Sequence, residues 1–307
     1  VWLKEVDSDA LQYSLRNLNT AYENFFRRIK SGNVPRFPKF KKKSSRASYH
    51  SCRANSTDFC IKNNRIKLRK LGYVKFRGYK QVSGSIMSVT VSKSSSGKYY
   101  CSILCNNVEL RDAESAISPV GIDLGLKDFL ITSDGAKVSN PKFLHKSERK
   151  LIRLQRRYSR TLKGSKNREK ARILLAKQYE NVSNQRNDFL HKLSTDIIKN
   201  HDIICTENLQ VKNMIKNHKL AKAISDVSWS KFVEYLSYKA QWYNRQLIKI
   251  DTFFPSSQIC SCCGYKNTTV KDLSIRQWKC LNCNSVHDRD INEAINILNE
   301  GLKLTTS

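Results

Sequence analysis

The sequence predicts an α+β chain with more than one domain, because three stretches carry different patterns. Residues 8 to 32 repeat apolar side chains every three or four positions, as one face of an amphipathic helix does. Between about residues 59 and 110 the apolar period changes to two, which is typical of consecutive antiparallel strands. Towards the C-terminus, two Cys-x-x-Cys pairs indicate a small metal-bound unit. The 307-residue length allows about two domains.

The charge balance predicts a polyanionic partner. The chain has 56 Lys and Arg against 26 Asp and Glu, a formal net charge of +30, which is far more than solubility requires. Aromatic side chains are spread through the basic stretches, which favours nucleic acid over a membrane surface. No segment approaches the apolar length that spans a bilayer, and no signal region is evident. We therefore expect a cytoplasmic, nucleoid-associated protein with reduced cysteines and no membrane partner.

The N-terminal helix is expected to begin at Ser8, as its N-cap, and to stop at Gly32. The chain then enters VPRFPKFKKKSSR, where two prolines exclude a helix and basic residues alternate with phenylalanines. Taken alone, such a run favours a solvated basic loop. If the run binds nucleic acid, the side chains expected to do so are Arg36, Lys39, Lys41, Lys42 and Lys43.

The strands between about residues 59 and 110 predict a small barrel or curled sheet without a catalytic arrangement, and thus a binding or scaffold element. After Pro119, VGIDLGLKDFLITSDGAKV predicts two strands and a turn at Asp134 and Gly135. Further along, DIICTE and IKIDTFF predict two more strands, and residues 229 to 247 predict an amphipathic helix. The last helix is expected to close at Gly301.

A helical hairpin with its turn at Gly164 is expected to be strongly basic. Between Lys142 and Lys177 the only acidic residues are Glu148 and Glu169. Solvated helix faces normally mix both signs, so this imbalance favours phosphate contact over a solvated hairpin. The side chains expected to contact phosphates are Arg149, Arg153, Arg156, Arg157 and Arg160.

Four cysteines have the spacing of a zinc ribbon. Cys260 and Cys263 form the first pair, and Cys280 and Cys283 form the second. Four thiolates around Zn²⁺ leave no open coordination position, so the predicted ion has a structural role. Cys262 lies between the first two and is the alternative ligand. The competing interpretation, free thiols, is disfavoured by the spacing.

Acidic residues stand at the ends of predicted elements in distant parts of the chain. Asp123 lies in the apolar strand VGIDLGL, where an unpaired carboxylate is costly to bury unless it binds a cation or a proton. Glu207 ends a second strand, and Asp288 and Asp290 begin the last helix. Each taken singly is more often a cap or a surface charge. Together they predict a carboxylate cluster for two Mg²⁺ or Mn²⁺ ions and phosphodiester hydrolysis.

The order of these motifs resembles one known family. GIDLGLKDFLITSDG, TENL, CSCCG with CLNC, and HDRDINEAINIL are similar to the RuvC-like nuclease of TnpB/OrfB proteins, which insertion sequences encode and which are compact relatives of type V CRISPR effectors. WLKEVDSDALQYSLRNLNTAYENFF and VPRFPKFKKK extend the likeness over nearly the whole chain. The resemblance implies an RNA-guided, metal-dependent DNA endonuclease with an RNase H-like core. Its expected partners are a guide RNA from the transposon end and a target DNA.

The resemblance also assigns residues and segments. Asp123, Glu207 and Asp290 match the three catalytic acids, whereas Glu293 stands where the family commonly has a small residue. The implied segments are a partial helical recognition segment with a basic linker (residues 1–50), a β-barrel-like wedge domain (51–118), a RuvC-like core (119–257) with the basic hairpin (142–200) inserted, a zinc ribbon (258–286) and a last RuvC motif with its helix (287–307).

Family members carry several tens of residues before WLKEV, so relative to them the chain is expected to be truncated at its N-terminus. The alternative to an active enzyme is a truncated, catalytically incompetent remnant that binds nucleic acid. Mg²⁺-dependent cleavage programmed by a cognate RNA separates these two interpretations. A strand transferase acting in transposition is a third interpretation, and no Tyr or Ser recombinase motif supports it.

Overall fold

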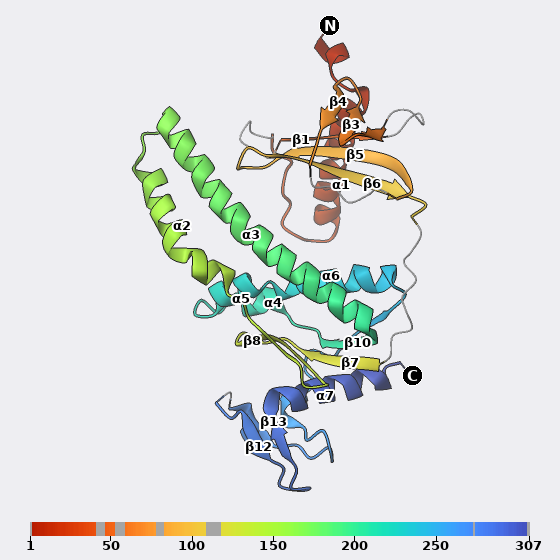
Figure 1. The fold of residues 1–307 in the computed structure, drawn as a ribbon, viewed down its shortest axis with the longest axis vertical. Helices are drawn as coiled ribbons and strands as arrows, with labels where there is room; N and C mark the ends of the chain where they lie inside the picture. The colour runs from red at the N-terminus through yellow and green to blue at the C-terminus, as the bar shows by residue number, and fades with distance from the viewer. Residues whose placement is uncertain are drawn as a thin grey trace. The chain divides into compact units, whose positions relative to one another are not determined.

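The computed structural model describes residues 2–40, 47–52, 59–77, 83–108, 118–272 and 274–305. The chain has two compact units (Figure 1). Unit 1 comprises Val1–Glu109 and Leu162–Lys177, and unit 2 comprises Leu110–Thr161 and Gln178–Ser307. The fold is a mixture of helices and small sheets, as the sequence predicts.

Unit 1 combines one long helix with two antiparallel three-stranded sheets of order β1-β5-β6 and β2-β3-β4. Asn63 and Asn64, with φ of 48° and 55°, make the tight turn between β2 and β3. The elements are a 3-10 turn (Trp2–Glu5), α1 (Ser8–Lys30), β1 (Ser48–Cys52), β2 (Ile61–Lys62), β3 (Arg65–Leu68), β4 (Gly72–Lys75), β5 (Ser85–Lys93) and β6 (Tyr99–Asn106).

The two sheets of unit 1 share a small apolar core. Phe59, Ile66 and Leu68 pack with Val89 of β5, so alternate positions of β3 point inwards. Within the described strands, no ladder of hydrogen bonds joins one sheet to the other. The predicted curled sheet is therefore two sheets held together by side-chain packing.

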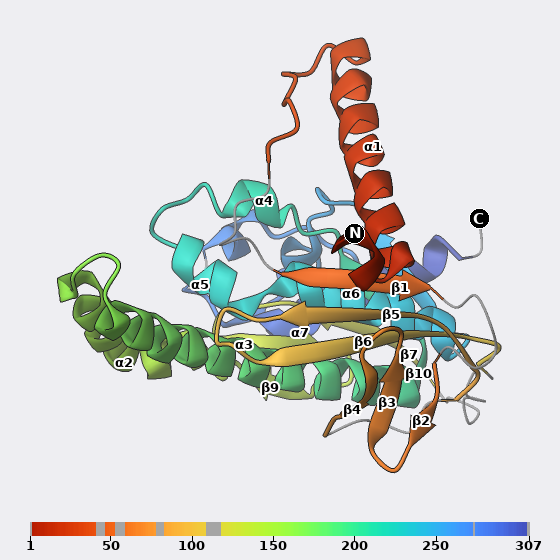
Figure 2. The same cartoon turned by 90° about the horizontal axis from the view of Figure 1, so that it is seen from above.

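Helix α1 begins one residue earlier than expected from a Ser8 cap. Asp7 is the N-cap, and its carboxylate accepts hydrogen bonds from Asp9 N at 3.1 Å and from Ser51 Oγ of β1 at 2.5 Å. This carboxylate thus fixes α1 to β1, from which the helix rises in Figure 2. The helix ends as predicted, because Gly32 follows it with a φ of 67°.

The sequence predicts an amphipathic helix here, and the apolar stripe of α1 buries none of its residues. Leu15, for example, is 67% exposed. Part of the stripe is covered by the basic segment that follows, because Phe37 packs edge-on against Tyr22 and Phe25, with ring centroids 5.7 and 5.4 Å apart.

Unit 2 is built on a five-stranded sheet of order β11-β10-β7-β8-β9. Strand β10 is parallel to both of its neighbours, β11 and β7. Strand β8 is antiparallel to both of its neighbours, β7 and β9. Its strands are β7 (Ser118–Asp123), β8 (Asp128–Thr132), β9 (Lys137–Ser139), β10 (His201–Glu207) and β11 (Gln246–Ile250). Its helices are α2 (Phe143–Arg160), α3 (Lys166–Asn200, shared with unit 1), α4 (Val211–Met214), α5 (Ala221–Val227), α6 (Trp229–Trp242) and α7 (Arg289–Lys303).

Helices cover both faces of this sheet (Figure 1). On one face, Val120, Ile122 and Ile204 pack in a core with buried side chains of α3 and α6. On the other face, Cys205 packs with Ile297 of α7. Successive strand residues therefore alternate between an α3–α6 side and an α7 side.

Two predicted boundaries in unit 2 are wrong. The helix expected over residues 229 to 247 ends at Trp242, because Asn244 adopts a left-handed φ of 50° and the chain enters β11 at Gln246. The last helix does not close at Gly301 but continues to Lys303. A Cβ at Gly301 would lie 2.3 Å from Cys205 Sγ, so this glycine permits close packing of α7 on β10.

The cysteine-rich segment forms a small lobe of unit 2 with little regular structure. It contains 3-10 turns at Ser256–Gln258 and Thr268–Lys271 and a hairpin of β12 (Gln277–Lys279) and β13 (Val286–Asp288). Among the described helices of the chain, none is both long and apolar enough to cross a bilayer.

Candidate active site, metal site and nucleic-acid interface

Neighbouring parallel strands bring Asp123 and Glu207 together. Asp123 is the last residue of β7 and Glu207 is the last residue of β10. The register pairs Ile122 with Thr206, so the residues that follow them, Asp123 and Glu207, lie side by side on the neighbouring strands. Because residue pairs alternate between faces, both carboxylates follow Gly121 and Cys205 onto the α7 side of the sheet.

Helix α7 lies directly against this part of the sheet. A Cβ built on Gly121 would lie 2.0 Å from the carbonyl oxygen of Ala294, so no larger residue fits there without moving the helix. The contact places Glu293, the neighbour of Ala294, beside the strand ends. One carboxylate oxygen each from Asp123, Glu207 and Glu293 lie within 4.8 Å of one another. We call these three side chains the carboxylate cluster.

A hydroxyl group connects two members of the carboxylate cluster. Ser256 Oγ lies 2.7 Å from Glu207 Oε1 and 2.9 Å from Glu293 Oε1. The backbone around Ser256 is held by α7, because Asn296 Nδ2 donates to Ser256 O at 2.8 Å and Asn292 Nδ2 donates to Ile259 O at 2.7 Å. These hydrogen bonds give a structural reason for asparagine at both positions of the last helix.

The carboxylate cluster concentrates negative charge in a confined place. Burial raises the pKa of Asp123 well above its ordinary value, and the charges of Glu293, Glu207 and Asp290 raise it further. Burial and the charge of Glu207 raise the pKa of Glu293 to about 7. Among the described residues, no basic side chain lies within ion-pair distance of these three carboxylates. A divalent cation is the ligand that would relieve this repulsion.

The donor set suits a hard divalent cation. Mg²⁺ and Mn²⁺ prefer carboxylate oxygens, and a group of three such oxygens within 4.8 Å can surround one ion. The structure thus has a carboxylate cluster compatible with metal binding at the C-terminal ends of β7 and β10.

The other predicted acids, Asp290 and Asp288, have different surroundings. Asp290 lies near enough for its charge to affect Asp123 but is not one of the three clustered carboxylates. Its Oδ1 is 3.3 Å from Nη1 of Arg276, which comes from the cysteine-rich lobe. Asp288 caps α7, since its Oδ1 accepts from Asp290 N and Ile291 N at 3.1 Å, and its Oδ2 pairs with Lys137 at 2.7 Å.

The four cysteines of the two Cys-x-x-Cys pairs converge. The sulfur atoms of Cys260, Cys263, Cys280 and Cys283 all lie within 4.8 Å of one another, which is compatible with a metal bound by four thiolates. Hydrogen bonds from the side chain and backbone N–H of Ser285 lower the pKa of the Cys283 thiol to about 6, which favours the thiolate that a metal needs.

Two further side chains border the four-thiol group. His287 Nε2 lies 3.1 Å from Cys260 Sγ, and burial lowers the pKa of this imidazole, which keeps it neutral. Cys262 is exposed and is not one of the four, but its sulfur lies within 4.8 Å of ligand atoms of Cys260 and His287.

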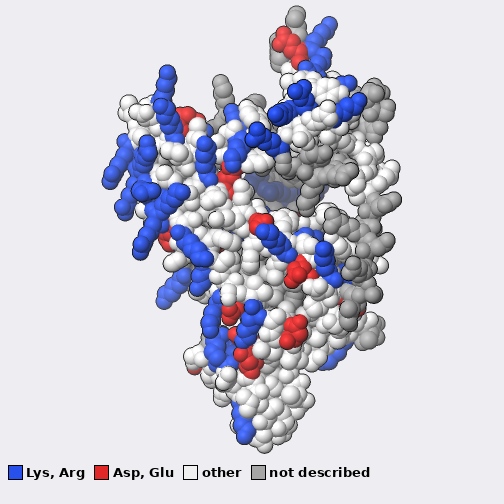
Figure 3. Space-filling view, in the orientation of Figure 1, with Lys and Arg blue, Asp and Glu red and all other residues white. Residues whose placement is uncertain are grey.

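The five arginines that the sequence singled out in the hairpin line one open groove on α2, of about 640 Å³. The groove is bordered by Arg149, Arg153, Arg156, Arg157 and Arg160, together with Ile152 and Thr161. All five arginines are exposed, and none forms an ion pair with a described carboxylate. Basic side chains crowd this helix at the left of Figure 3. The turn predicted at Gly164, with a φ of 83°, is confirmed.

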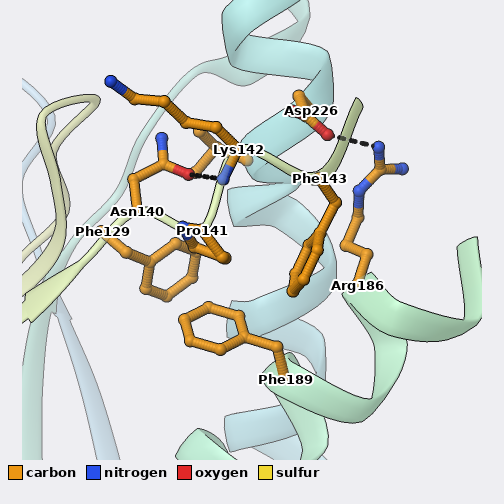
Figure 4. Close-up of a pocket in the computed structure, with 9 residues that line it drawn as sticks. Phe129, Asn140, Pro141, Lys142, Phe143, Arg186, Phe189 and Asp226 are labelled. Carbon is orange, nitrogen blue, oxygen red and sulfur yellow. Dashed lines mark hydrogen bonds and ion pairs between the residues drawn. The ribbon is translucent and has the colours of Figure 1, made fainter. Parts of the chain in front are cut away.

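The start of α2 is fixed by other helices of unit 2 (Figure 4). No side chain of its own N-cap residue, Lys142, caps the helix; instead Asp226 of α5 accepts from Leu144 N at 3.1 Å. Arg186 of α3 pairs with the same carboxylate at 2.6 Å. Phe129 and Phe189 pack below, around a cavity of about 10 Å³. These contacts fix the start of α2, and with it the arginine groove, to the rest of unit 2.

The basic segment after α1 is only partly described. Arg36 and Lys39 are exposed in unit 1, whereas Lys41, Lys42 and Lys43 lie outside the described residues. Nothing in the described part of this segment forms an ordered binding surface comparable to the arginine groove.

Sequence reasoning missed three side chains around the carboxylate cluster, namely Glu293, Ser256 and Arg276. Glu293 follows Asp290 by three residues and so lies on the same face of α7, a signal that the sequence does carry. Ser256 and Arg276 carry no comparable signal, because only the folding of the cysteine-rich lobe brings them to the cluster.

Two family models match the chain. One is described as "Probable transposase" (the OrfB family of IS605 elements) and matches residues 102–218. The other is described as "Cas12f1-like, TNB domain" and matches residues 229–297. The first match includes Asp123 and Glu207, and the second includes the four cysteines and Asp290.

Relatives share much of the chain's length. A Streptomyces pristinaespiralis protein named "Putative RNA-guided DNA endonuclease" is 38% identical over 98% of this chain and 73% of its own length. The Escherichia coli K12 protein "Putative RNA-guided DNA endonuclease InsQ" is 34% identical over 98% of this chain and 76% of its own. "TnpB-like protein L79" of Acanthamoeba polyphaga mimivirus is 28% identical over 60% of this chain and 37% of its own.

A solved structure, that of a Cas12f1–sgRNA–target DNA complex, aligns over 96% of this chain and 86% of that chain at 16% identity, with a TM-score of 0.44. Family membership rests on the sequence relatives, two of which match nearly the whole chain at more than 30% identity. The chain therefore belongs to the TnpB (OrfB) family of insertion-sequence proteins.

Proposed function

We propose that the protein is an RNA-guided, metal-dependent DNA endonuclease of a transposable element, which hydrolyses phosphodiester bonds by a two-metal RuvC-type mechanism. The observation that carries the proposal is the position of Asp123 and Glu207 at the ends of adjacent parallel strands, facing Glu293, with Asp290 one turn earlier on α7. The names of the two long relatives support the same activity.

The sheet supports an RNase H-like core. Three antiparallel strands in chain order are followed by two parallel strands added beside the first, which gives the order β11-β10-β7-β8-β9. In such a sheet the ends of the first and fourth strands are neighbours, and here these ends carry the two acids. A helix packed on that face then supplies the remaining acids.

The chain's own residues would prepare the site for hydrolysis. Two divalent cations, when bound, activate the attacking water and stabilise the leaving 3′ oxygen. Asp123 and Glu207 would bind the cations from rigid strand ends, so their oxygens would need little reorganisation. Ser256 would orient the Glu207 carboxylate through its 2.7 Å contact. Arg276 would balance the charge of Asp290 when the site is empty.

The arginine groove is proposed to hold nucleic acid through its phosphates. Five exposed arginines without acidic partners on a firmly anchored helix suit a regular phosphate backbone. We infer a guide RNA from the transposon end and a target DNA as partners, in keeping with the relatives' names. Because these contacts would involve phosphates, base pairing rather than this groove would read the sequence.

The four-thiol site is proposed to bind one structural Zn²⁺. Zinc is the usual ion for four cysteine ligands at this spacing, and it would hold the lobe that carries Ser256 and Arg276 near the carboxylate cluster. A zinc-dependent lobe next to the acids would couple folding of the lobe to the geometry of the site.

Cleavage of a DNA target by the full chain with its cognate RNA tests the proposal. The chain should cut only in the presence of Mg²⁺ or Mn²⁺, and the Asp123→Ala variant should bind nucleic acid but leave it intact. Binding without cleavage by the wild-type chain would instead favour the catalytically incompetent remnant. Cleavage undiminished in Asp123→Ala would refute the assignment of the site.

A further inference from the structure

Helix α7 carries two carboxylates one turn apart whose surroundings differ. Asp290 is engaged by Arg276, whose Nη1 lies 3.3 and 3.4 Å from its two oxygens. Glu293 has no ion-pair partner among the described residues and contributes an oxygen to the carboxylate cluster instead. The helix thus presents Glu293, more directly than Asp290, to Asp123 and Glu207.

The carboxylates of Glu293 and Glu207 both face one hydrogen-bond donor, the hydroxyl group of Ser256. Ser256 Oγ lies within hydrogen-bond distance of both carboxylates, but a hydroxyl group has a single hydrogen to donate. One of the two oxygens facing Ser256 is therefore left without that donor at any moment. A cation between the carboxylates would satisfy the remaining lone pairs of all three acids.

The Glu293 carboxylate is not needed to attach the turn at Ser256 to α7. The turn at Ser256 is already held by Asn296, which donates to Ser256 O at 2.8 Å and to Ile259 O at 2.6 Å. Asn292 adds a bond to Ile259 O and accepts one from Ser261 N at 2.9 Å. The attachment of the lobe to α7 would therefore survive loss of the Glu293 carboxylate.

We propose that Glu293 is a ligand of the divalent cations and adds its carboxylate to those of Asp123 and Glu207 at the metal site. This inference rests on the proposed function, since it names a further residue of the same site. It assigns a metal-binding role to a position where most relatives are expected to have a small side chain.

Mn²⁺ binding to the full chain, measured from the electron paramagnetic resonance signal of free Mn²⁺ with zinc retained, tests the proposal. Glu293→Gln preserves the shape of the side chain and its ability to contact Ser256, so the fold should be kept, as circular dichroism would verify. We expect this variant to weaken Mn²⁺ binding by about tenfold or more.

The matched control is Glu300→Gln, which alters the same residue type on the same helix, where Glu300 contacts Lys303 and not the cluster. Equal weakening of Mn²⁺ binding by Glu293→Gln and Glu300→Gln would overturn the proposal. If Asp123→Ala weakens binding while Glu293→Gln does not, the inference fails and the proposed function stands. If the wild-type chain binds Mn²⁺ no better than Asp123→Ala, both fail.

Discussion

At the scale of single residues, the site consists of buried and half-buried carboxylates and the few groups that contact them. Asp123, Glu207 and Glu293 come from three elements distant in sequence, and Ser256 is the hydroxyl that contacts two of them. The charge of each carboxylate raises the cost of ionising the next. Without a cation, the site therefore opposes folding at the pH at which it would work.

Stability of the metal-free chain should reflect this cost. The pKa of Glu293 is raised from 4.5 to about 7 in the folded chain, so its contribution to stability is fully present below about pH 4.5 and is lost as the pH rises through about 7. Asp123 acts in the same direction. Urea unfolding without added Mg²⁺ should show a free energy of unfolding lower at pH 8 than at pH 5, by roughly 1–3 kcal/mol.

Glu293→Gln has no carboxylate at this position and should lose much of that pH dependence, while Glu300→Gln should keep it. Added Mg²⁺ should restore stability at pH 8 in the wild-type chain. An identical pH dependence in wild type and Glu293→Gln would mean that Glu293 does not titrate in the cluster.

The four-thiol site gives a second prediction at the residue scale. Purified chain should contain about one zinc, and Cys280→Ser should lose it because Cys280 is a buried member of the four. Cys262→Ser is the matched control and should retain the zinc, since Cys262 is exposed and outside the four. Elemental analysis decides the matter, and undiminished zinc in Cys280→Ser would remove that cysteine from the site.

At the scale of elements, close contact between α7 and the sheet sets the geometry of the cluster. Gly121 on β7 and Gly301 on α7 leave no room for a Cβ, and between them α7 crosses the strands that carry both acids. Asp123 and Glu207 were placed by their strand-end positions, which the apolar patterns VGIDLGL and DIICTE made visible. The helix contact was not visible, because a glycine in sequence is equally consistent with a turn or a cap.

Gly121→Ala should separate α7 from β7. The added methyl group would meet backbone rather than a flexible side chain, so we expect a loss of about 1–3 kcal/mol of stability and weaker Mn²⁺ binding. Gly164→Ala at the hairpin turn is the control: its Cβ would meet nothing within 4 Å, its positive φ costs stability, and Mn²⁺ binding should be unchanged. Equal Mn²⁺ affinity in wild type and Gly121→Ala would show that the contact does not position the acids.

Other elements show where pattern-based prediction loses information. The strands of unit 1 and the hairpin turn at Gly164 followed from local periodicity and turn residues. The periodicity of α1 predicted an apolar face but not what covers that face, and none of the helix residues is buried. Glu293 was seen as a departure from a family pattern, and its place in the cluster emerged only when three elements were packed together.

At the scale of the whole molecule, the excess of positive charge is best understood as a property of particular surfaces. Five exposed arginines gather along one groove of α2, whereas most described acids are paired, capped or clustered. A phosphate backbone satisfies such a groove without any base contact. Opposite charges are therefore separated, with exposed arginines along the groove of α2 and acidic side chains gathered in the carboxylate cluster.

Changing Arg153, Arg156, Arg157 and Arg160 together to Gln should weaken nucleic-acid binding and flatten its salt dependence. Each lost phosphate contact should reduce the slope of log affinity against log salt by about 0.7–0.9, equally for all sequences. A control that replaces the exposed Lys192 and Lys199 should leave the slope unchanged. An unchanged slope in the arginine variant would mean that the groove meets only water, and a loss confined to one sequence would mean that it reads bases.

We propose that the ends of β7 and β10, together with α7, form a divalent-cation site. A crystal structure of the chain soaked with Mn²⁺, with anomalous diffraction to locate the ions, tests it most directly. We expect anomalous peaks bonded to oxygens of Asp123, Glu207 and Glu293, with two ions about 3.5–4 Å apart when nucleic acid is bound. Absence of anomalous density from the carboxylate cluster, with ions bound only elsewhere in the chain, would contradict it.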